Sequence, residues 1–214
     1  MKKYYKNGGN TRLKIKVCGM RDPDNIADLL ELPIEYIGFI FHPKSPRYMD
    51  DRVVMTNAVK RTGVFVDAPL QEVQRRIETF LLDAVQLHGK ESPEYCIAMK
   101  ARGLEVIKAF SVGADFDFQE TERYEGAADY FLFDTKTALH GGSGVQFDWE
   151  ILNNYHGQTP FFLSGGIGLK DADKIKAVHH PKLYALDLNS RFEISPALKD
   201  IHQLTQFLKA IHID

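Results

Sequence analysis

The stretch Tyr130-Phe131-Leu132-Phe133-Asp134 is a continuous apolar run that stops on one carboxylate. A run that is apolar on both faces, instead of alternating with polar residues, is typical of a strand covered on both sides, as in a parallel sheet. A second stretch, Lys16-Val17-Cys18-Gly19-Met20, has the same strand-like form and stops on a thiol. The two stretches indicate buried strands that each end on a reactive side chain.

Eight such runs recur along the chain, 21 to 31 residues apart. Most of them are continuous, which again favours strands of a parallel sheet. They begin near Lys14, Tyr36, Thr62, Ala84, Glu105, Tyr130, Phe161 and Tyr184.

Helical segments are expected between these runs. Asp22-Pro23 and Ser92-Pro93 each place a capping side chain before a proline, which suits the first helical position. Residues 70–77 and 201–211 show apolar residues at helical spacing. The connection over residues 116–125 is short, aromatic and acidic, and gives no clear helical pattern.

Eight strand–helix units of this length predict the α/β class and a closed (β/α)8 TIM barrel. An open doubly wound sheet is the structural alternative, and eight near-equal units favour closure. A chain of 214 residues suits one sizeable domain. We expect a loose N-terminal tail over residues 1–12, where apolar residues are few, and the barrel over residues 13–214.

Composition excludes several classes of partner. The formal net charge of −2 gives no electrostatic footprint for general nucleic-acid binding, so local groups have to hold any anionic ligand. No apolar run reaches the ~20 residues that span a bilayer. The basic N-terminus also lacks the apolar segment of a secretory signal. We therefore expect a cytoplasmic protein that binds neither nucleic acid nor membrane.

The two cysteines are too few for a disulfide framework, and their surroundings differ. Cys96 lies in a helix-like stretch and is most simply a small buried hydrophobe. Cys18 ends a strand and precedes a glycine, so a more exposed position is expected for it. A free thiol, with a pKa of about 8.5, is a usable base only where its surroundings favour the thiolate. From the residues alone, Cys18 fits a structural role as well as a catalytic one.

Polar residues at the C-terminal ends of the expected strands are the candidates for an active site, because that face of a barrel carries it. Asp134 ends an apolar strand, where an unpaired buried carboxylate is costly, so a function is favoured for it. A thiol and a carboxylate at two strand ends would form a base and an acid, which points to proton transfer on a small molecule. The candidates are Cys18, Arg47, Gln86, His88, Lys108, Asp134, Ser164, Gly165, Gly166, Asp187, Asn189 and Ser190.

Several of these candidates have two interpretations. Ser164-Gly165-Gly166-Ile167-Gly168 could cradle a phosphate with its backbone N–H groups, or simply make a tight turn. Gly141-Gly142-Ser143-Gly144 is either a flexible linker or a mobile flap over a ligand. Arg47 could bind a substrate carboxylate in a bidentate manner, or its side chain could simply be solvated. Gln86 and His88 could line the pocket or be satisfied structural groups.

The sequence resembles the phosphoribosylanthranilate isomerase family of tryptophan biosynthesis from about Lys14 to Asp200. No single motif decides this, but many occur in order and at the right spacing. They include Lys16-Val17-Cys18-Gly19, Gly38-Phe39-Ile40-Phe41, Ser45-Pro46-Arg47-Tyr48, Gly63-Val64-Phe65-Val66, Val85-Gln86-Leu87-His88-Gly89, Ile107-Lys108-Ala109-Phe110, Phe133-Asp134-Thr135, Gly141-Gly142-Ser143-Gly144, Phe147-Asp148-Trp149 and Leu163-Ser164-Gly165-Gly166.

The resemblance implies a (β/α)8 barrel without metal or organic cofactor and with a small phosphorylated substrate. It implies conversion of N-(5-phosphoribosyl)anthranilate to 1-(o-carboxyphenylamino)-1-deoxyribulose 5-phosphate, with Asp134 as general acid and Cys18 as general base. Arg47 matches the residue that holds the anthranilate carboxylate. Gly165-Gly166 matches the phosphate-binding turn, and Asp187 a residue near the ribose hydroxyls. The family includes monomers and homodimers, and the sequence favours neither.

The chain departs from the family pattern after the last strand, where the family commonly reads Asp-Val-Ser-Ser-Gly-Val-Glu. Arg191 stands here in place of the glycine whose N–H would face the phosphate. Either the turn is kept and the guanidinium of Arg191 adds charge, or the turn after the seventh strand holds the phosphate. Two alternatives to the isomerase are a related phosphate-binding barrel, such as an indole-glycerol-phosphate synthase, and a barrel that binds its ligand without turnover.

Overall fold

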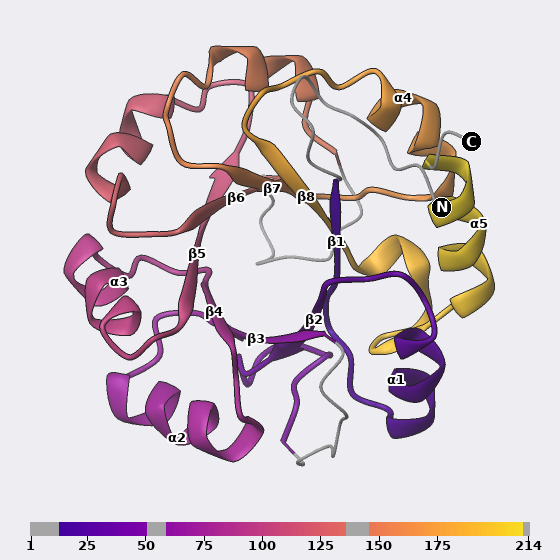
Figure 1. Ribbon diagram of the computed structural model, residues 1–214, viewed down its shortest axis with the longest axis horizontal. Coiled ribbons are helices and arrows are strands. Elements are labelled where there is room, and N and C mark those ends of the chain that lie inside the picture. The colour runs from indigo at the N-terminus through magenta and orange to yellow at the C-terminus, as the bar shows by residue number, and fades with distance from the viewer. Residues whose placement is uncertain (1–12, 51–58, 136–145, 212–214) are drawn as a thin grey trace.

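Eight parallel strands close into one ring in the computed structural model, which describes residues 13–50, 59–135 and 146–211 (Figure 1). Each strand pairs with the next along the chain, and β8 pairs with β1 to close the ring. The predicted barrel is therefore confirmed. The strands are β1 (Lys14–Val17), β2 (Tyr36–Ile40), β3 (Lys60–Phe65), β4 (Ala84–Leu87), β5 (Glu105–Val112), β6 (Tyr130–Thr135), β7 (Phe161–Leu163) and β8 (Leu183–Leu188).

Helical segments surround this ring on its outer side (Figure 1). They are α1 (Pro23–Leu30), α2 (Leu70–Phe80), α3 (Pro93–Lys100), η1 (Phe118–Tyr124), η2 (Trp149–Asn154), η3 (Leu169–Asp171), α4 (Ala172–Lys176) and α5 (Ile201–Ile211). Asp22 and Ser92 cap α1 and α3, each with a proline in the first turn, as the sequence predicts. The connection without a clear helical pattern forms the 3-10 helix η1.

A short antiparallel hairpin follows the last barrel strand. It consists of the 3-10 turn η4 (Ser190–Phe192) and the strands β9 (Glu193–Ser195) and β10 (Leu198–Lys199). The side chains of Glu193 and Lys199 point from this hairpin toward one another and form an ion pair. The hairpin thus brings two buried charges to the end of the barrel where β8 stops.

Strand β6 shows why the runs are continuous. Phe131 and Phe133 belong to the apolar layer that the helices share with the outer surface of the ring. Leu132 lies in a separate cluster inside the ring, with Phe162 and Ala185 among its neighbours. Since successive side chains of a strand point to opposite faces, Asp134 follows Leu132 to the inner side. Both faces of the strand are buried, and the carboxylate lies at the end of the inner one.

The ends of the chain lie partly outside the described residues. The predicted N-terminal tail over residues 1–12 is among them, so the division of the chain into tail and barrel stays a prediction. In the part that the structure describes, no helix is long and apolar enough to cross a membrane.

Candidate active site

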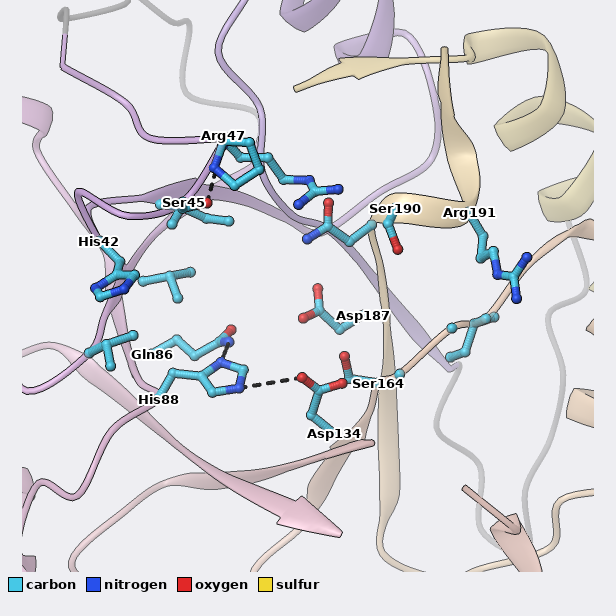
Figure 2. Close-up of a pocket in the computed structure, with 18 residues that line it drawn as sticks. His42, Ser45, Arg47, Gln86, His88, Asp134, Ser164, Asp187, Ser190 and Arg191 are labelled. Atoms are coloured by element: carbon cyan, nitrogen blue, oxygen red, sulfur yellow. Dashed lines mark hydrogen bonds and ion pairs between the residues drawn. The ribbon is translucent and has the colours of Figure 1, made fainter. Parts of the chain in front are cut away.

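A pocket opens at the end of the ring where the strands finish, and eleven of the predicted site residues line it (Figure 2). Strands from opposite sides of the ring contribute to it, together with the loop after β2. The predicted residues in this lining are Arg47, Gln86, His88, Asp134, Ser164, Gly165, Gly166, Asp187, Asn189, Ser190 and Arg191.

Asp134 lines the pocket beside His88, which directly follows β4 (Figure 2). Its Oδ2 lies 3.4 Å from His88 Nε2, and its Oδ1 accepts a hydrogen bond of 2.9 Å from the Thr135 backbone N–H. Gln86 Nε2 lies 2.9 Å from His88 Nδ1. His88 Nδ1 therefore faces the Gln86 amide, and its Nε2 faces Asp134.

Cys18 follows β1 directly and is buried, with 3% of its surface exposed. Its backbone N–H bonds to Leu188 O at 2.9 Å, which fixes the end of β1 against β8. The sulfur occupies space that Gly38 leaves free, since a Cβ on Gly38 would lie 2.7 Å from Sγ. The expectation of a more exposed position for Cys18 is wrong, because β2 packs a glycine against it. The thiol lies behind the pocket lining rather than in it.

Burial raises the pKa of the Cys18 thiol, because a thiolate is poorly solvated in the interior. Lys16 opposes this shift. Lys16 is fully buried, and its Nζ lies 2.9 Å from Asp187 Oδ1. Burial likewise raises the pKa of the Asp187 carboxyl, and Lys16 again acts in the opposite direction. A thiol, an ammonium and a carboxyl thus share one interior region.

Arg47 reaches the pocket from the loop after β2, but one edge of its guanidinium is already engaged. Its Nε lies 2.8 Å from Glu193 Oε1, and its Nη2 lies 2.6 Å from Glu193 Oε2. Lys199 Nζ donates to the same carboxylate at 2.6 Å and to Asn189 Oδ1 at 2.9 Å. Burial alone would raise the pKa of Glu193, but bonds from Arg47 and Lys199 hold it below its usual value. The cluster holds Arg47 in place and carries an excess of one positive charge.

The glycine turn after β7 forms another part of the pocket wall. Gly165 and Gly166 have φ of +94° and +67°, a region that side-chain-bearing residues rarely adopt. Gly165 also packs against Thr135, where a Cβ would collide with the threonine side chain. Arg191 lies close to the same turn, since a Cβ on Gly168 would be 3.3 Å from Arg191 Cβ. The turn and the stem of the Arg191 side chain therefore lie next to one another.

A family model for N-(5'phosphoribosyl)anthranilate (PRA) isomerase matches residues 15–210 of the chain. The chain belongs to the PRA isomerase family. It is 47% identical to the N-(5'-phosphoribosyl)anthranilate isomerase of Parabacteroides distasonis over 204 residues, which cover 92% of each chain. Members of this family are isomerases of tryptophan biosynthesis.

Solved structures of PRA isomerases share the fold. The enzyme from Thermotoga maritima superposes with a TM-score of 0.80 at 30% identity, covering 93% of this chain and 98% of that one. Another PRA isomerase structure, in complex with reduced 1-(o-carboxyphenylamino)-1-deoxyribulose 5-phosphate, gives a TM-score of 0.78 at 28% identity and the same coverage. That protein binds a phosphorylated product analogue.

Besides Cys18, two predicted site residues of this PRA isomerase are not among the described residues that line the pocket. Lys108 faces the helix layer, where its Nζ lies 3.2 Å from Glu91 Oε2 and 2.7 Å from Gly89 O. The prediction that Lys108 binds the substrate is therefore not supported. Gly142 lies outside the described residues.

Three buried charged residues that the sequence reasoning missed complete the site, namely Lys16, Glu193 and Lys199. Lys16 carried a signal, because it stands two residues before Cys18 and so shares its face of β1. Glu193 and Lys199 carried none that composition or spacing could show. No group of three or more His, Cys, Asp or Glu side chains that could hold a metal ion occurs in residues 13–50, 59–135 and 146–211.

Gly165→Ala should destabilise the PRA isomerase and weaken inhibition by inorganic phosphate, because the sequence predicts that this turn binds phosphate. The alanine would carry the strain of a positive φ, about 1–3 kcal/mol, and would also press on Thr135. Gly103→Ala is the matched control, because Gly103 has φ +80° with no atom within 4 Å of a Cβ. Thermal unfolding and inhibition by inorganic phosphate measure the two effects. If the two variants lose equal amounts of thermal stability and are inhibited equally by phosphate, the contact with Thr135 has no role.

Glu193→Gln should loosen Arg47 and raise KM by about tenfold, since a hydrogen bond to a charged group contributes about 1.5–3 kcal/mol. Because the proton-transferring groups stay in place, kcat should change less. Glu91→Gln removes a comparably buried carboxylate beside Lys108, away from the pocket, and should cost stability without changing KM. An unchanged KM in Glu193→Gln would show that Arg47 needs no support from the hairpin.

Proposed function

We propose that this PRA isomerase converts N-(5-phosphoribosyl)anthranilate to 1-(o-carboxyphenylamino)-1-deoxyribulose 5-phosphate, with Asp134 as general acid and Cys18 as general base. The observation that supports this most is that Asp134 shares one pocket lining with two arginines from separate elements, Arg47 of the loop after β2 and Arg191 of η4 (Figure 2). The substrate carries two anionic groups, a benzoate carboxylate and a phosphate, with the reacting atoms between them. Two separated cations above one carboxyl group suit this arrangement.

The orientation of the substrate follows from these two cations. Arg47 offers the benzoate carboxylate the guanidinium atoms that Glu193 does not engage. The Gly165-Gly166 turn and Arg191 form the phosphate end, where backbone N–H groups and a guanidinium supply hydrogen bonds. Ser190 lies beside them in the lining.

The ribose would then lie over the centre of the pocket. Asp187 and Asn189 line this region. Gln86 Oε1 is buried without a hydrogen-bond partner among the described residues, and a ribose hydroxyl would satisfy it. Ser164 lies at the same level, next to Asp134 (Figure 2).

In the first step, Asp134 protonates the ribose ring oxygen, and the ring opens to an iminium ion. A carboxyl group donates a proton near neutral pH only where its environment keeps it protonated. Asp134 is 8% exposed and lies at the end of the inner face of β6. A substrate that covers the pocket would exclude the remaining water from Asp134.

In the second step, the thiolate of Cys18 takes the proton from C2′, and the enolamine that forms tautomerises to the ketone. The iminium nitrogen makes the C2′ proton more acidic, so a base of modest strength suffices. Cys18 Sγ lies against Gly38, at the carboxyl end of β1, the strand that pairs with β8, which carries Asp187. This chemistry needs only the two proton-transferring groups of the chain.

Loss of the fluorescence of phosphoribosylanthranilate on addition of the purified protein tests the proposal. The expected result is turnover that stops when the substrate is exhausted, with the reduced product analogue as a competitive inhibitor. Analogue binding without turnover would instead favour a barrel that binds its ligand without catalysis, and Arg191 would be the first residue to exchange for glycine. Release of carbon dioxide with ring closure, when 1-(o-carboxyphenylamino)-1-deoxyribulose 5-phosphate is supplied instead, would favour the indole-glycerol-phosphate synthase alternative.

A further inference from the structure

Lys16 is a fully buried lysine inside the barrel, and the proton-transfer steps described above do not use it. Its place is decided by β1, on which Lys16 and Cys18 are two residues apart and therefore point to the same, inner face. In the ring, Lys16 lies opposite Asp187 of β8 in register. The ammonium thus has a carboxyl across the strand pair and a thiol along its own strand.

The ammonium of Lys16 has two neighbours, the Asp187 carboxyl and the Cys18 thiol, and it contacts the carboxyl more closely. Lys16 Nζ lies 2.9 Å from Asp187 Oδ1, and Cys18 stands two residues along on the same inner face, near enough for the ammonium and the sulfur to interact electrostatically. Gly38 keeps the sulfur in this place, because a side chain at position 38 would displace it. An isolated buried ammonium is very costly, so the site requires one anion beside it. Two groups are available to supply that anion.

We propose that Lys16 is a positioning residue shared between Asp187 and Cys18, and that its ammonium is the counter-ion of the Cys18 thiolate. This inference rests on the proposed role of Cys18 as the base. When Cys18 ionises, its S–H proton passes by way of water to the Asp187 carboxylate, which becomes a neutral acid, and the thiolate takes its place as the anionic partner of Lys16. Asp187 and Cys18 then compete for one cation, and the region holds one negative charge at a time.

The charges around the site agree with this competition. Burial alone would lower the pKa of Lys16, but Asp187 and Cys18 together raise it, so the ammonium stays protonated. Besides Lys16, Cys18 faces Asp187 from β8 and Lys199 from β10. The charge of Lys199 is partly balanced, because its Nζ forms an ion pair with Glu193 at 2.6 Å. Lys16 therefore has the larger influence on the thiol.

Asp187 has its own neighbours besides Lys16. The Asp134 carboxyl of β6 and the His88 imidazole, which follows β4, also interact with Asp187, and they act in opposite directions on its pKa. Arg47 lies beyond Lys199, in the cluster around Glu193. None of these groups is removed in the variants below, so their contribution stays constant in the comparison.

The test is the pKa of Cys18, followed by NMR of protein labelled with 13C at the cysteine Cβ, with no substrate present. Cys18→Ser identifies the signal, because only Cys96 remains in that variant. Asp187→Asn removes the competing anion, and the pKa of Cys18 should fall by about 1–3 units. In Lys16→Met/Asp187→Asn the fall should be lost, because the cation is gone. Removal of both members of a buried ion pair is often tolerated, so this variant is expected to fold.

Lys108→Met is the matched control. Lys108 is a buried lysine paired with Glu91 on the outer side of the ring, and its loss should reduce stability without changing the pKa of Cys18. An Asp187→Asn variant with an unchanged thiol pKa would overturn the inference. An equal fall of the Cys18 pKa in Asp187→Asn and in Lys16→Met/Asp187→Asn would also overturn it. Such a result would reflect only the loss of a nearby negative charge.

Failure of this inference and failure of the proposed function give different results. The NMR titration needs no turnover, so it reports on Lys16 alone. The proposed function fails if Cys18→Ser turns over substrate as the parent does, whatever the titration shows.

Discussion

Cys18→Ser is expected to lower kcat by about 10²–10⁴-fold, the usual contribution of a positioned general base. A serine hydroxyl has nearly the size of the thiol but loses its proton far less readily. In a buried site that already disfavours the thiolate, the alkoxide would not form. Loss of phosphoribosylanthranilate fluorescence measures the rate, and binding of the reduced product analogue shows that the pocket is intact.

Cys96→Ser is the matched control for this variant. Cys96 is fully buried in α3 and distant from the pocket lining, so its exchange tests the cost of a buried hydroxyl without touching the site. We expect some loss of stability and an unchanged kcat. If Cys18→Ser keeps more than a tenth of the parent rate, another group must remove the C2′ proton.

Asp134→Asn is expected to lower kcat by about 10²–10⁴-fold as well, because an amide cannot give a proton to the ring oxygen. The side chain keeps its shape, and its carbonyl oxygen can still accept from the Thr135 N–H and from His88. Analogue affinity should therefore change little. Single-turnover measurement should find the substrate bound with its ring closed.

Asp129→Asn is the control for Asp134→Asn. Asp129 immediately precedes β6, at the opposite end of the same strand, and pairs with Lys100 at 2.9 Å. Its exchange should affect stability and leave kcat unchanged. A normal rate in Asp134→Asn would exclude Asp134 as the acid and direct attention to His88, the other proton donor at the base of the pocket.

The fold could be predicted from the sequence because each unit carries its own signal. In β6, apolar residues on both faces identify a strand covered on both sides, and Asp22-Pro23 and Ser92-Pro93 identify helix starts through local capping. These are short-range effects, and they act the same way wherever the segment lies in the fold. Closure of the ring places all eight strand ends at one face, so most of the predicted residues meet in one pocket.

Lys108 shows where this reasoning fails. In β5 the residues on both sides of Lys108 are apolar, so the sequence shows no alternation that tells the inner face from the outer. The choice of face is made by pairing with β4 and β6, and it turns Lys108 outward to Glu91. The burial of Cys18 was missed for a similar reason, because Gly38 makes room for the sulfur from a neighbouring strand.

The sequence by itself determined the barrel, the order of its strands and the pocket to which Asp134 belongs, because apolar periodicity and capping are local. Only the tertiary structure decided which charges are partners. Lys16 and Asp187 are 171 residues apart in the chain, and Arg47 and Glu193 are 146 apart. Closure of β8 on β1 and the hairpin after β8 bring these groups together in the interior, where a buried charge is stable only beside an opposite one.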